Sequence, residues 1–163
     1  MTEHPNIELS RRGYDAFAKG DMATLTELIA DDVVWHVRGV GPLDGDYHGR
    51  DQVFGFFGRL AEETGGTFRL DVHDILANDE HTAVLCNLSA TRGNKSVATQ
   101  VVNVSHTRDG RITEFWSATT DPQAALDFCG FQLGTVHDYM EPPGSPELEE
   151  AYQRYVSEPD VNR

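Results

Sequence analysis

The decisive stretch of the sequence is residues 81–120, which read HTAVLCNLSATRGNKSVATQVVNVSHTRDGRITEFWSATT. β-Branched and aromatic side chains recur through it, and such residues favour extended strands. Gly93-Asn94 and Asp109-Gly110 interrupt the pattern, and both dipeptides are typical of tight hairpin turns. The stretch therefore predicts three consecutive antiparallel strands, at residues 81–92, 96–108 and 111–120.

Upstream of this stretch, Asn78-Asp79 is a further turn signal, and residues 67–77 before it favour a fourth strand of the meander. The first third of the chain has helical periodicity, with helices expected near residues 6–19 and 50–63 and a short one between them. Gly20 is expected to end the first helix and Asp21 to cap the next. A strand is expected at Val33 to Val37, and the glycine-rich stretch after it, through Gly49, is expected to be a loop.

Three helices followed by a four-strand meander predict the α+β class, because such helices pack together on one face of the sheet. Strands this long twist and curl, so we expect a cone-shaped half-barrel: a curved antiparallel sheet with helices covering its concave face. An apolar pocket should lie between the two layers. Residues 1–130 are expected to form this one domain. Residues 131–163 are expected to be an acidic C-terminal extension and not an independent domain.

The charge of the chain limits its partners. The formal net charge is −14, from 27 acidic and 13 basic residues. Such a field repels nucleic acid and anionic lipid, so we expect neither nucleic acid nor membrane as partner. No signal peptide or long apolar segment is visible, which predicts a cytoplasmic location. The seven histidines show no metal-ligand spacing, and no phosphate loop is present, so we expect no metal and no cofactor.

Four segments resemble a known family. They are Tyr14-Asp15-Ala16-Phe17-Ala18-Lys19-Gly20-Asp21, Ala30-Asp31-Asp32-Val33-Val34-Trp35-His36, Gly45-x-Tyr47-x-Gly49-Arg50 and Asp109-Gly110-Arg111-Ile112-x-Glu114-x-Trp116. Together they are similar to SnoaL-like proteins of the nuclear transport factor 2 superfamily, which also holds ketosteroid isomerases and limonene epoxide hydrolases. The resemblance covers about residues 6–130. It implies the half-barrel fold, but it does not fix the reaction, since one fold hosts many functions.

His36 is the first candidate for catalysis. It falls where the similar isomerases place their general-base aspartate, and an imidazole can shuttle a proton near neutral pH. With Phe57 and Phe115 expected around it, desolvation should lower the pKa of His36. The alternative is a pocket or core histidine that only makes a hydrogen bond.

Asn103 and Tyr14 are the next candidates. The resemblance places Asn103 near the isomerases' oxyanion-binding acid, and an amide can donate to such an oxygen. A polar residue on the outer face is the alternative. Tyr14 is one residue out of step with the isomerases' catalytic tyrosine, so we expect it to bring its hydroxyl to the pocket wall.

On the last strand, Phe115 and Ser117 are expected to face inward with Phe57 as substrate-binding residues. Ser117 replaces an aspartate of the epoxide hydrolases, which makes epoxide hydrolysis a poor candidate. Asp121 continues the inward parity, and similar polyketide cyclases use a late acid as base. The alternative for Asp121 is a helix cap before Pro122.

Two functions are left open by these residues. One is a cofactor-free isomerase, cyclase or hydrolase that acts on a small hydrophobic carbonyl compound, with His36, Asn103 and Asp121 as catalytic residues. The other is a non-catalytic module that binds a small molecule in the same pocket. In either case, the outer sheet face with Val102, Val104 and Trp116 predicts a homodimer.

Overall fold

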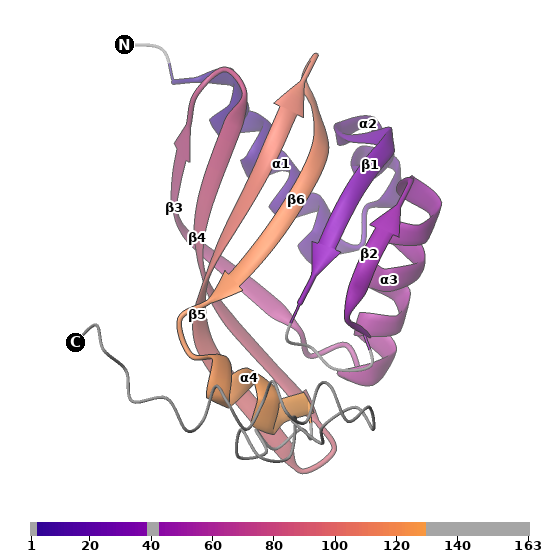
Figure 1. Ribbon diagram of the computed structural model, residues 1–163, viewed down its shortest axis with the longest axis vertical. Helices are drawn as coiled ribbons and strands as arrows, with labels where there is room; N and C mark the ends of the chain where they lie inside the picture. Colours follow the sequence, from indigo (N-terminus) through magenta and orange to yellow (C-terminus); the bar gives the residue numbers. More distant parts are fainter. Residues whose placement is uncertain (1–2, 39–42, 130–163) are drawn as a thin grey trace, which may run out of the picture. The chain divides into compact units, whose positions relative to one another are not determined.

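The computed structural model describes residues 3–38 and 43–129 (Figure 1). Three helices come first along the chain, with one break for a pair of strands: α1 (Pro5–Lys19), α2 (Met22–Leu28) and α3 (Arg50–Glu63). Gly20 ends α1 in the left-handed conformation, at φ 68°, and the carboxylate of Asp21 accepts from the backbone N–H of Thr24 to cap α2. The expected helix signals at both positions are confirmed.

The sheet has six strands in the order β2-β1-β6-β5-β4-β3. Their bounds are β1 (Ile29–Val37), β2 (Gly45–His48), β3 (Arg69–Ala77), β4 (His81–Arg92), β5 (Lys95–Arg108) and β6 (Arg111–Thr119). The meander β3 to β6 is antiparallel, with Val84 opposite Asn103 and Asn103 opposite Ser117. At the turn between β5 and β6, Asp109 and Gly110 both have positive φ, at 54° and 70°, as a hairpin turn of this kind requires.

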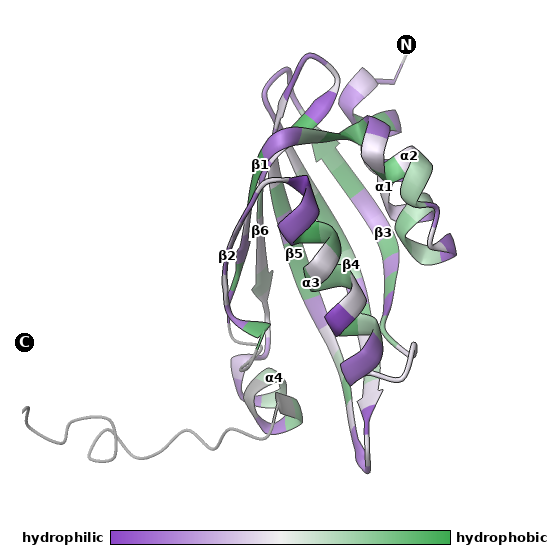
Figure 2. Ribbon diagram, turned by 90° about the vertical axis from the view of Figure 1, so that its right-hand side faces the viewer, coloured by the Kyte–Doolittle hydropathy of each residue, from purple (hydrophilic) through white to green (hydrophobic). Residues whose placement is uncertain are grey.

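The first three helices lie on the same side of the sheet, as Figure 2 shows. Between the layers, Val33 and Val53 are fully buried, and Trp35 and Phe56 pack with them in a core shared by β1 and α3. A second cluster, of Val84, Cys86 and Val101, lies on the inner face of β4 and β5 and contacts Tyr14 of α1. The helix α4 (Pro122–Cys129) follows β6 and packs on β5.

The predicted fold class is confirmed: the structure is α+β, with a curved, unclosed sheet and helices on one face. Two details differ from the expectation. β1 pairs with β6 in parallel, so the sheet is mixed. The glycine-rich stretch expected as a loop contains β2, which pairs antiparallel with β1 through Trp35 and Tyr47.

Two further points concern the limits of the domain. None of the helices in the described ranges has the length and apolar character needed to cross a membrane. The extension predicted at residues 131–163 lies outside the described residues, so its separation from the rest of the chain stays a prediction.

Candidate functional site

A cavity of about 160 Å³ lies between the inner face of the sheet and helices α1 to α3. An aromatic wall closes one side. Trp35 of β1 stacks on Phe115 of β6 with ring centroids 3.7 Å apart, and Phe57 of α3 meets Trp35 edge to face at 5.4 Å. Phe17 of α1 meets Phe57 in the same way at 5.0 Å. For comparison, an engineered apolar cavity of about 150 Å³ in another protein binds benzene. The cavity therefore has room for about one ring.

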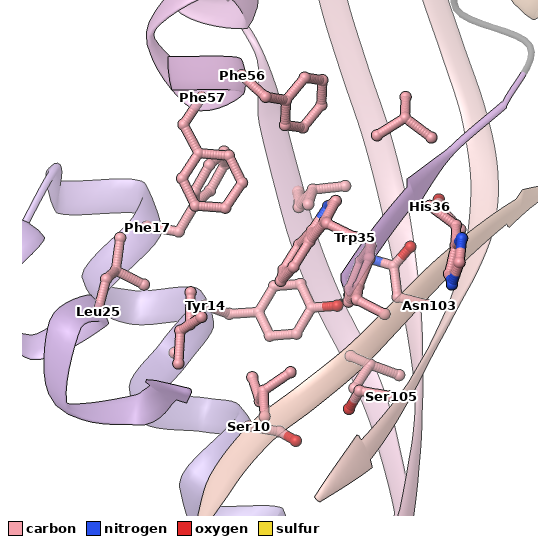
Figure 3. A pocket seen from close by; sticks show the side chains of 18 of the residues that line it. Ser10, Tyr14, Phe17, Leu25, Trp35, His36, Phe56, Phe57, Asn103 and Ser105 are labelled. Atoms are coloured by element: carbon pink, nitrogen blue, oxygen red, sulfur yellow. Dashed lines mark hydrogen bonds between the residues drawn. The ribbon is translucent and has the colours of Figure 1, made fainter. Parts of the chain in front are cut away.

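Polar groups also line the cavity. Tyr14 points from α1 toward Asn103 of β5, as Figure 3 shows. The side-chain amide of Asn103 donates to the Tyr14 hydroxyl oxygen at 2.7 Å. Nearer the start of α1, Thr82 and Ser105 share a buried hydroxyl–hydroxyl hydrogen bond of 2.6 Å.

One buried polar atom of the site lacks a hydrogen-bond partner among the described residues. Asn103 is only 2% exposed, and its carbonyl oxygen Oδ1 is buried with no hydrogen-bond partner in the described part of the chain. A buried acceptor without a partner costs about 1–3 kcal/mol of folding free energy. Because Asn103 lines the cavity, a ligand that donates a proton there would remove that cost.

The Tyr14 hydroxyl stays protonated at any physiological pH, so it can donate a hydrogen bond. Burial raises the pKa of Tyr14 well above its ordinary range, and the neighbouring Cys86 thiol adds to the shift, although the hydrogen bond from Asn103 lowers it. Since the Tyr14 oxygen already accepts from Asn103, its own O–H is the group that can be donated. In the structure the Cys86 thiol is a hydrogen-bond partner of this hydroxyl, and a ligand that accepts from Tyr14 would replace it. Burial also raises the pKa of the Cys86 thiol, which makes that cysteine a poor nucleophile.

His36 is among the residues that line the cavity, but its ring does not point into the cavity as the sequence predicted. Figure 3 shows Trp35 and His36 on opposite sides of β1, and Trp35 is the one that faces Phe57 and Phe115. The His36 ring is on the outer face, where Nε2 lies 2.8 Å from Glu114 and Nδ1 lies 2.7 Å from Asp46.

The expected pKa shift of His36 is therefore wrong in sign. Its hydrogen bond to Glu114 has the largest effect and raises the pKa of His36; partial burial opposes it, and the hydrogen bond to Asp46 raises the pKa further. The physical reason is that the ring faces two carboxylates instead of the aromatic side chains of the cavity. A base role for His36 at this cavity has no support in the geometry.

The other predicted site residues divide into two groups. Tyr14, Phe57, Asn103, Phe115 and Ser117 all line the cavity, as expected from their faces. Asp121 does not line it: its carboxylate accepts from the backbone N–H of Ala124 at 3.0 Å and caps α4. The cap alternative describes its position, and the role as a cyclase-type base has no support in the geometry.

Sequence reasoning missed Trp35 as a cavity residue, although the signal was present. Along β1 the buried residues Val33, Trp35 and Val37 alternate with more exposed positions, which include His36. This alternation alone assigns Trp35 to the core face. The resemblance, which placed His36 at the position of the isomerases' general base, favoured the opposite face. No comparable signal marked Ser105 or Thr82 as a buried pair.

Comparison with known proteins supports one family. The SnoaL-like domain family matches residues 10–115. An uncharacterized protein of Mycobacterium tuberculosis is 33% identical over 129 residues, 78% of this chain and 98% of that protein. The structure of Bal32a, from a soil-derived mobile gene cassette, is 36% identical with a TM-score of 0.73, covering 76% of this chain and 95% of its own. IdmH, a candidate polyketide cyclase from Streptomyces antibioticus, is 25% identical with a TM-score of 0.63, covering 78% of this chain and 99% of its own. The chain belongs to the SnoaL-like domain family.

Proposed function

We propose that this protein binds a small, mainly apolar phenol or enol, whose one hydroxyl group lies at Tyr14 and Asn103. The observation that carries the proposal is the buried, unpartnered Oδ1 of Asn103 beside the Tyr14 hydroxyl. A ligand hydroxyl can accept from Tyr14 and donate to Asn103 at once. A carbonyl oxygen can only accept, so it leaves Asn103 Oδ1 unpaired.

The test is a matched pair of one-ring probes, 4-methylphenol and 4-methylanisole, titrated by isothermal calorimetry. The two differ by the donor proton and one methyl group. We expect 4-methylphenol to bind more tightly by about tenfold or more, since an unmade buried hydrogen bond costs about 1–3 kcal/mol. The variant Asn103→Leu should reduce that preference, and Ser96→Leu, at an exposed position of β5, is the control. Equal affinities for the two probes in the wild type would contradict the proposal.

Catalysis is the second candidate function, and the same geometry favours it for carbonyl compounds. A ketone becomes its enol when the carbon beside the carbonyl loses a proton and the oxygen gains one. A site that holds the enol better than the ketone stabilises the intermediate of an isomerase or cyclase reaction. Such chemistry would agree with the candidate cyclase role of IdmH. In this step a base from solvent would take the proton from carbon, the Tyr14 hydroxyl would donate a hydrogen bond to the developing enol oxygen, solvent would supply the proton of that oxygen, and no cofactor would be used.

Hydrogen exchange tests this second function directly. In heavy water, a cyclic ketone such as 4-methylcyclohexanone should exchange the protons beside its carbonyl faster with the protein than in buffer alone, as measured by NMR. Tyr14→Phe should lose most of this acceleration. If the wild type gives no acceleration while 4-methylphenol binds, the protein is the non-catalytic binding module.

The cytoplasmic location stays a prediction from the sequence.

A further inference from the structure

A second cavity, of about 110 Å³, adjoins the first. It lies between the C-terminal end of α3, the adjoining ends of β4 and β5, and α4. Its floor is apolar: Ala90, Val97 and Val101 are all buried and line it. It contains neither Tyr14 nor Asn103, so it adds volume to the site without adding another copy of the polar pair.

The two cavities share part of their wall. Three apolar side chains line both of them: Leu60 of α3, Leu88 of β4, and Phe68, which comes just before β3. Arg38 and Ser117 also line both. The three apolar side chains are only partly buried, and they lie between the two cavities. On the side of the first cavity, Phe68 meets Phe17 edge to face at 6.1 Å. The two cavities are thus neighbours along this shared wall.

The far end of the second cavity is weakly polar. Thr99 and Thr119 line it, and their hydroxyl oxygens lie 3.2 Å apart across β5 and β6. Three charged side chains also line it: Arg92 forms a salt bridge with Glu63 at 2.9 Å, and Arg38 forms one with Asp46 at 2.7 Å. Each of these charges thus has a partner of opposite sign. The lining favours an uncharged apolar chain over a charged group.

We propose that one elongated ligand occupies both cavities, with a hydroxyl-bearing ring against Tyr14 and Asn103 and an uncharged alkyl or alkenyl tail in the second cavity. The ring end rests on the proposed function, whereas the tail rests on the shared wall and the apolar floor. The ligand class is therefore an alkyl-substituted phenol or enol and not a compact single ring. The tail passes between Leu60, Phe68 and Leu88.

A series of 4-alkylphenols tests this proposal, from 4-methylphenol to 4-heptylphenol, titrated by isothermal calorimetry. Each methylene that enters an apolar cavity should improve affinity about fourfold. We expect this gain to continue over the first several carbons and to stop when the second cavity is full. A series in which affinity is flat from 4-methylphenol onward would overturn the proposal.

The variant Ala90→Phe places a ring in the second cavity. It should abolish the gain with chain length while leaving the affinity for 4-methylphenol unchanged. Ala98→Phe is the matched control, because Ala98 is an exposed residue of β5 and adds the same side chain outside the cavity. Should Ala90→Phe fail to fold, Ala90→Leu makes the same test with a smaller group, and a thermal melt identifies that case.

The outcomes separate this inference from the proposed function. If 4-methylphenol itself does not bind, the proposed function fails. If 4-methylphenol binds and the longer phenols gain nothing, only the elongated ligand is wrong. If the longer phenols gain affinity equally in the wild type and in Ala90→Phe, their tails lie elsewhere and the assignment of the second cavity is overturned.

Discussion

The imidazole of His36 stacks on the indole of Trp116, with ring centroids 5.1 Å apart and planes inclined by 16°. The contact joins β1 to β6 on the outer face of the sheet, away from the cavity. Glu114, also on β6, lies against both His36 and His106, at 2.8 Å and 3.2 Å. Because carboxylates flank both ring nitrogens of His36, this arrangement favours the imidazolium form, which donates from both of them.

Glu114→Gln should therefore lower the pKa of His36. The change removes the carboxylate whose hydrogen bond raises that pKa most, and leaves an amide of nearly the same shape. NMR titration of the histidine ring signals measures the shift. Glu62→Gln, which makes the same change at an exposed position of α3, is the control. An unchanged pKa of His36 in Glu114→Gln would show that the hydrogen bond to Glu114 does not raise that pKa.

The pH dependence of stability follows from the same contacts. The pKa of His36 is raised in the folded state, so its contribution is complete below about pH 6.5 and is lost as pH rises through the folded value. The pKa of Asp46 is lowered, chiefly by His36, so its contribution is lost as pH falls below about 3.8. We expect the stability difference between the wild type and His36→Gln to be largest between these limits. Urea unfolding across the pH range measures it. A difference that grows above neutral pH would contradict the assignment.

Tyr14→Phe should destabilise the fold by about 1–3 kcal/mol, because it leaves the buried Asn103 amide without the acceptor that it now has. Adding Asn103→Leu should recover part of that loss, since the double variant buries no unpaired donor. Urea unfolding of the two single variants and the double variant measures the coupling. Strictly additive losses would mean that the hydrogen bond contributes nothing.

We expect the protein to be a homodimer through the outer face of the sheet. Val102, Val104 and Trp116 are partly exposed there, on neighbouring strands of the sheet. Light scattering should give about twice the chain mass of 18.1 kDa. Val104→Asp should shift the protein to monomer, whereas the isosteric Val104→Thr should shift it far less. A wild-type mass of one chain at micromolar concentration would refute the dimer.

The long strands and the two long helices could be predicted because their signals are local. Asp109-Gly110 marks a turn by its own conformation, and helical periodicity is contained in a few turns of α1 and α3. β2 has no such signal: Gly45–His48 is short and rich in turn residues, and it is extended because β1 pairs with it. Tertiary pairing here outweighs local propensity.

The candidate site was predicted along β5 and β6, where the resemblance and the alternation of the strands agree, and was missed on β1, where they disagree. Asn103 and Phe115 face inward as the alternation along β5 and β6 requires. The Glu114 partner of His36 lies 78 residues further along the chain. That contact depends on the parallel alignment of β1 with β6, which no short-range pattern indicates. Without it, a histidine on a polar strand face resembles a base.

That alignment also governs how the protein can fold while it is being made. Val34 of β1 pairs with Glu114 of β6, so the partner of this early strand is made 80 residues later. At about 5–20 residues per second, β1 waits on the order of ten seconds for it. During that interval Trp35 has no Phe115 to stack on, and one edge of β1 is unpaired. A chain that stops before Arg111 lacks both partners, so we expect such a fragment to be prone to aggregation.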